Sequence, residues 1–187
     1  AATGTNTVHL NFSNRPIVNT LYVQAQANAH AQGDLDTSSA DLFIRFNSAI
    51  NGSAGCLGGK SWYYGLDGQP PSNRIDLLAV ILHELAHGLG FTTFADLSSG
   101  AKFLGYNDAL LHQLEDHALG KTWHQLSDAQ RASSAVSGAN LHWIGSRVNT
   151  AATGLTAGVN QGHVMMYAPA ILSEGSSAVH FSELLTP

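Results

Sequence analysis

NRIDLLAVILHELAHGLG, the stretch from Asn73 to Gly90, decides the fold. Its apolar residues recur at helical spacing and form one stripe, made of Ile75, Leu78, Leu82, Leu85 and Leu89. Asn73 is expected to cap the helix, with Asp76 in the position of the capping-box acid. Gly88 and Gly90 are expected to end it. The stretch therefore predicts one strong helix that follows the break at Pro70-Pro71.

Two histidines of this helix, His83 and His87, lie one turn apart on a face away from the apolar stripe. Zinc takes neutral imidazole nitrogens at about 2 Å, and positions i and i+4 supply two of them from one rigid element. Glu84 is placed beside the metal without ligating it, so it would accept a proton from a water that attacks a carbonyl. Zinc would lower the pKa of that water towards about 7 and polarise the carbonyl. The motif predicts a zinc-dependent peptidase.

The composition excludes two classes of partner. The net charge is -5 and the eight Lys and Arg residues are scattered, whereas phosphate binding needs clustered cations. Apolar runs are much shorter than the roughly 20 residues of a membrane span. Protein or peptide substrates are therefore expected, with no nucleic acid and no membrane, and the chain is expected to be a monomer. Cys56 is the single cysteine, so an internal disulfide is excluded, and we expect an inert thiol there.

The start Ala1-Ala2-Thr3-Gly4-Thr5 lacks the charged-then-apolar pattern of a signal peptide. With the low lysine content and the abundant Ser, Thr and Gly, we interpret the chain as a secreted protein. It would be the mature form that remains after a signal and any pro-segment have been removed.

The chain carries neither repeats nor a long linker, which predicts one catalytic domain over residues 1–187. The expected fold class is α+β, with an N-terminal lobe of about 1–90 and a C-terminal lobe of about 91–187. The N-terminal lobe would combine a twisted sheet with the zinc helix, and the C-terminal lobe would be mostly helix and coil. An active-site cleft is expected between the lobes.

Periodicity locates the remaining elements. Strands are predicted at 8–12, at 41–47 and around Trp62-Tyr63-Tyr64, and a helix from Asn14 to about Ala31. Further helices are predicted at about 107–118 and from Ser127, where Gln130 completes a capping box. The strand at 41–47 would be either an internal strand or an exposed edge that pairs with an extended peptide.

A catalytic zinc usually has three protein ligands, so the helix pair needs a third. The run from His83 to Phe91 resembles the start of the metzincin zinc signature, in which a third histidine follows the glycine by three residues. Thr93 occupies that position here, so the compact metzincin pattern fails.

The leishmanolysin-like branch of the metzincins has a long insertion before a third histidine that precedes an aromatic residue. SAVHFS, from Ser177 to Ser182, resembles that segment. The resemblance extends less specifically over most of the chain, including Leu141-His142-Trp143 and Tyr167-Ala168-Pro169, to secreted bacterial proteins of this type. It implies a metzincin-like fold and one catalytic zinc bound by His83, His87 and His180.

One departure from the family leaves alternatives open. The family places a methionine turn after the third histidine, whereas Met165 and Met166 precede His180. Either the turn lies beyond Pro187, or Val164-Met165-Met166-Tyr167 is that turn and His142 is the third ligand. A gluzincin arrangement would instead use Glu115.

The sequence allows two further interpretations, a calcium site and a different function. Asp34, Asp36 and Asp41 cluster in a polar segment that could hold calcium, but their spacing lacks the EF-hand pattern and favours a solvated turn. The alternative function is a catalytically inactive, zinc-stabilised binding module. Glu84 counts against it, because a structural zinc site needs no general base.

Overall fold

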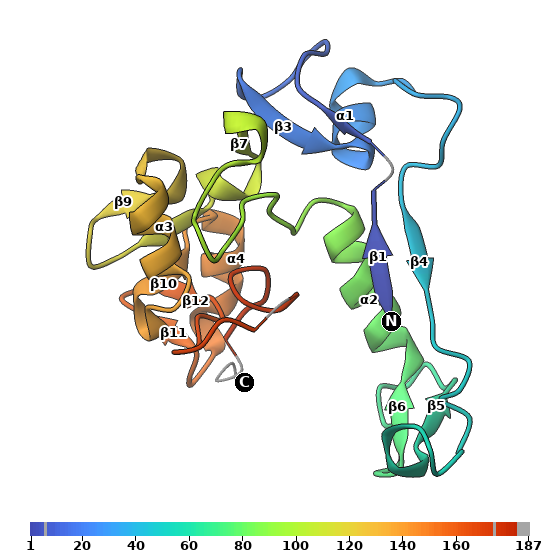
Figure 1. Cartoon of the computed structure of the whole chain (residues 1–187). Helices are drawn as coiled ribbons and strands as arrows, with labels where there is room; N and C mark the ends of the chain where they lie inside the picture. The colour runs from blue at the N-terminus through green and yellow to red at the C-terminus, as the bar shows by residue number, and fades with distance from the viewer. Residues whose placement is uncertain (6, 174, 183–187) are drawn as a thin grey trace. The chain divides into compact units, whose positions relative to one another are not determined.

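The computed structural model describes residues 1–5, 7–173 and 175–182, and the chain divides into two compact units. Unit 1 consists of Ala1–Pro16 and Tyr22–Phe91, and unit 2 of Ile17–Leu21 and Thr92–Pro187. The described residues form four α-helices and four small sheets, so the structure is mixed α+β, as predicted (Figure 1). Among these residues, none of the helices has the length and apolar character of a bilayer span.

Helix α2 (Leu77–Gly88) carries the zinc motif in unit 1. Its N-cap is Asp76, whose Oδ1 accepts hydrogen bonds from the amides of Leu78 at 2.9 Å and Ala79 at 3.3 Å. The predicted cap at Asn73 is wrong, because Arg74–Asp76 is strand β6, which pairs in parallel with β5 (Ser61–Tyr63). The Asp76 carboxylate accepts hydrogen bonds from two amides that have no partner within the first helical turn. Its negative charge also interacts favourably with the positive end of the helix dipole.

The two predicted glycines do end α2. A β-carbon on Gly88 would lie 2.8 Å from Cδ2 of Leu42, and Gly90 has a φ of +108° with the Gln26 side chain against its Cα. The apolar stripe is only partly buried, since Leu82 and Leu89 are 59% and 56% exposed. The glycines therefore fix where the chain leaves the helix, whereas helical spacing overstates how much of the stripe is core.

A two-stranded antiparallel sheet of β1 (Ala2–Gly4) and β4 (Phe43–Arg45) packs against α2. Strand β4 lies within the strand predicted at 41–47. Its partner on one side is β1, and no described strand pairs with its other side. Strand β4 is therefore an edge strand among the described residues.

The helix predicted from Asn14 to Ala31 is wrong in its first half. Helix α1 is Gln24–Ala31, and Thr20–Val23 before it is strand β3, with all four residues buried. Strand β3 pairs with β2 (Val8–His9), a shorter strand than the predicted 8–12, and with β7 (Asn107–Asp108). A fully buried run with a β-branched residue at each end favours a strand with two partners over a helix.

Unit 2 contains a five-stranded antiparallel sheet in the order β11-β12-β10-β8-β9. Its strands are β8 (Leu114–Asp116), β9 (Lys121–Thr122), β10 (Leu141–Trp143), β11 (Val159–Asn160) and β12 (His163–Met165). The prediction of a lobe of mostly helix and coil did not include this sheet, but the strands are short and most of the described lobe is indeed helix and coil. The helix predicted at 107–118 is replaced by β7, a short 3-10 helix and β8, because β8 pairs with the neighbouring β9 on one side and with the more distant β10 on the other.

Helix α3 (Asp128–Ser134) confirms the prediction at Ser127, where the capping box with Gln130 is present. Arg131 on this helix is 2% exposed, and its Nε donates to the carbonyl of Gly100 at 2.7 Å. Helix α4 is Ser146–Ala151. The 3-10 helices are Leu57–Gly59, Phe103–Gly105, Leu110–His112, Trp123–Gln125, Gly138–Asn140 and Ala152–Gly154.

Candidate metal centre

His83 and His87 lie on successive turns of α2 with their rings nearly perpendicular, at an interplanar angle of 85°. Their Nε2 atoms are 3.1 Å apart. Two imidazole nitrogens bound to one tetrahedral zinc at about 2.05 Å would be about 3.3 Å apart. The helix therefore presents two ligand atoms at nearly the spacing that zinc requires, from a single element of unit 1.

A backbone carbonyl determines which nitrogen of His87 can bind a metal. Nδ1 of His87 lies 2.8 Å from the carbonyl oxygen of Phe91, which can only accept a hydrogen bond. Nδ1 therefore carries the proton, and Nε2 presents its lone pair towards His83. The turn after Gly88 supplies this carbonyl, because it brings the chain back beside the end of the helix, where the amide of Phe91 donates to the carbonyl of Ala86 at 2.9 Å.

His180 in unit 2 has the same arrangement. Its Nδ1 lies 2.9 Å from the carbonyl oxygen of Ser176, so Nδ1 donates and Nε2 is left with a lone pair. The carbonyl belongs to a closed turn, in which the amides of Ser176 and Ser177 both donate to the carbonyl of Ser173 at 3.0 Å. Ser177 is fully buried. The turn therefore holds the acceptor that orients His180.

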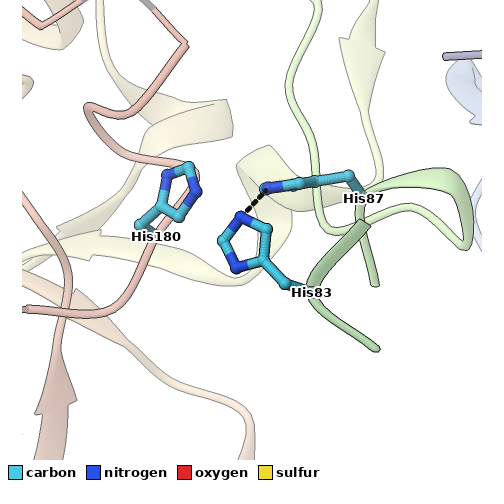
Figure 2. A group of neighbouring side chains, drawn as sticks. All are labelled: His83, His87 and His180. Carbon is cyan, nitrogen blue, oxygen red and sulfur yellow. Dashed lines mark hydrogen bonds between the residues drawn. The ribbon is translucent and has the colours of Figure 1, made fainter. Parts of the chain in front are cut away.

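Figure 2 draws the three predicted ligands, His83 and His87 on α2 of unit 1 and His180 of unit 2. Each offers one ring nitrogen as a possible metal ligand. In His87 and His180 the second ring nitrogen is already bonded to a backbone carbonyl. Neutral imidazoles held in this way fit the donor set of a zinc ion.

Glu84 is the predicted base. It follows His83 directly on α2 and is 8% exposed. A largely buried glutamate is uncommon, because an ionised carboxylate loses much of its hydration there. Its place beside the first histidine of the pair is the one that a proton acceptor for an attacking water needs.

The alternative third ligands lie in the five-stranded sheet of unit 2, and neither belongs to the group in Figure 2. His142 is fully buried, and its Nε2 donates to the carbonyl of Ala139 at 2.7 Å. Burial lowers the pKa of His142. Glu115 is directly opposite His142 in the sheet, and its Oε1 lies 3.5 Å from Nδ1 of His117. Both therefore contact neighbours within unit 2.

Thr93 occupies the position of the third histidine in the compact metzincin pattern. Its side chain instead binds the buried carboxylate of Asp108. Its hydroxyl donates to Oδ2 of Asp108 at 2.7 Å, and the amide of Phe94 donates to the same oxygen at 2.8 Å. Asp108 is 3% exposed, and burial raises its pKa. Sequence reasoning missed Asp108, since its partners, the Thr93 hydroxyl and the amides of Phe94 and Leu111, come together only in the fold.

The acidic segment that could hold calcium is a hydrogen-bonded turn. Asp36 accepts hydrogen bonds from the hydroxyls of Ser38 and Ser39, and these bonds lower its pKa. Asp41 accepts one from the Asn28 side chain at 2.8 Å. Cys56 is partly exposed, and Asn47 donates to its sulfur at 3.7 Å. These contacts account for both features without a ligand.

Comparisons with protein-family models, with curated proteins and with solved structures found no match for this chain.

Proposed function

We propose that this chain is a zinc-dependent endopeptidase of metzincin type that cleaves protein or peptide substrates and acts outside the cell. His83, His87 and His180 would hold one zinc ion, and Glu84 would be the general base. The observation that carries the proposal is the pair of imidazoles on α2, whose Nε2 atoms lie 3.1 Å apart beside a largely buried glutamate.

Bound zinc would supply a Lewis acid that lowers the pKa of water and polarises the scissile carbonyl. The carbonyls of Phe91 and Ser176 hold two of the imidazoles in the tautomer that offers Nε2. Glu84 accepts a proton as water attacks the peptide carbon and then donates it to the leaving amine. The low exposure of Glu84 strengthens its electrostatic interactions at the site.

A peptide substrate is also supported by strand β4 of unit 1. One edge of β4 pairs with β1, and its other edge has no partner among the described strands. Such an edge presents amide and carbonyl groups that an extended peptide can pair with, independently of its side chains.

Removal and return of zinc test the proposal against a zinc-stabilised binding module. We expect the purified chain to cleave casein, to lose that activity on treatment with a chelator, and to regain it with one equivalent of zinc. The melting temperature should fall only slightly, because each unit contains hydrogen-bonded strands of its own that include none of the three proposed ligands. A large fall in melting temperature, with no activity in either state, would support the structural module instead.

A further inference from the structure

His180 is held by a short antiparallel pairing within unit 2. The amide of Tyr167 donates to the carbonyl of His180 at 2.8 Å, and the amide of Ser182 donates to the carbonyl of Met165 at 2.8 Å. Between these bonds, Met166 and Phe181 form an antiparallel bridge. The segment from Met165 to Tyr167 is therefore the partner of the segment that carries His180, and it lies within the suggested methionine turn Val164-Met165-Met166-Tyr167.

This pairing is anchored in the core of unit 2. Met166 is 1% exposed, and its amide donates to the carbonyl of Leu141 in β10 at 2.8 Å. On the other segment Ala178 is fully buried, and its amide donates to the carbonyl of Tyr167 at 2.8 Å. The backbone on both sides of His180 is thus bonded to the five-stranded sheet or to its direct continuation.

The residue after His180 has a specific side-chain partner. The ring of Phe181 meets the indole of Trp143, on β10, edge to face, with the ring centroids 6.2 Å apart and an interplanar angle of 81°. Edge-to-face aromatic pairs of this kind stabilise beyond the area that they bury. Phe181 held on Trp143 therefore fixes the backbone of the residue that directly follows His180.

We propose that Phe181 and Trp143 are positioning residues for the third metal ligand: they hold the backbone of His180 so that its Nε2 faces the bound ion. This inference rests on the proposed function, since it assigns the ring pair to a zinc ligand. Neither ring touches the metal or the substrate in this role. The effect of both rings is expected to pass through His180.

The experiment measures zinc affinity of the full chain by competition with a chromogenic chelator. Phe181→Leu is expected to weaken zinc binding roughly tenfold, the range found when outer contacts of metal ligands are lost. Phe181→Tyr keeps the ring and should restore the affinity. Phe103→Leu is the matched control, because it makes the same change on a ring that is 46% exposed and packs on Phe94. It should leave the affinity unchanged.

A double variant separates positioning from general destabilisation. Phe181→Leu should have no further effect on zinc affinity once His180→Ala is present, because the ligand through which it acts is gone. An additional loss in the double variant, or an unchanged affinity in Phe181→Leu alone, would overturn the inference. If His180→Ala itself leaves zinc affinity unchanged, the proposed ligand set fails instead, so the two failures are distinct.

Discussion

Substitution of Asp108 by alanine should destabilise unit 2 by about 3 kcal/mol. The carboxylate accepts hydrogen bonds from the Thr93 hydroxyl at 2.7 Å, the Phe94 amide at 2.8 Å and the Leu111 amide at 3.1 Å. A buried donor left without an acceptor costs about 1–3 kcal/mol, so three donors give about 3–9 kcal/mol, and towards the lower end here because the bonds from Thr93 and Phe94 are only partly buried. The buried carboxylate itself destabilises the folded state, and its removal offsets part of this cost. The expected net decrease in the free energy of unfolding is therefore about 3 kcal/mol.

The assay is urea unfolding of the full chain at neutral pH, with Asp96→Ala as the matched control. Asp96 lies in an exposed turn and accepts hydrogen bonds from the amides of Ser98 and Ser99 at 2.8 and 3.1 Å. Because water can replace this acceptor, the control should lose less than about 1 kcal/mol. Equal losses for Asp96→Ala and Asp108→Ala would refute the argument that burial sets the cost.

Two further predictions concern pH and helix capping. Burial, with His124 beside it, lowers the pKa of His112 from 6.5 to about 4, so the folded chain binds fewer protons than the unfolded chain between these values. Stability should therefore be full above about pH 6.5 and fall by about 1–2 kcal/mol towards pH 4, which urea midpoints at several pH values would show; His112→Gln should flatten the decrease. Asp76→Ala should cost about 1 kcal/mol in thermal unfolding, while Asp76→Asn, which also caps a helix, should cost less; equal losses would contradict the capping role.

The sequence predicted elements that depend on local signals. Helix α2 and its glycine end follow from residues adjacent in the chain, and α3 follows from the capping box at Ser127. Strand β3 was mistaken for helix because its partners, β2 and β7, lie elsewhere in the sequence. Strand β8 was missed because its pairing with the distant β10, and with β9 next to it, overrides its helical spacing.

The candidate site likewise combines local features, which the sequence predicts, with features that depend on distant segments, which it does not. The spacing of His83 and His87 is local, and helical geometry alone brings their Nε2 atoms together. His180 was suggested by a family resemblance, since no spacing rule connects it to α2. The carbonyls of Phe91 and Ser176 were not predictable, because every residue has a carbonyl and only the folded turns select these two.

The central claim is that Glu84 is the base of a zinc-dependent hydrolysis. The most direct test is the rate of casein cleavage by zinc-loaded Glu84→Gln, which keeps the size of a side chain that is 8% exposed and removes its basicity. The account predicts that the variant binds zinc as the parent does and cleaves about 10²–10⁴ times more slowly. Cleavage at the parental rate by the zinc-loaded variant would contradict it.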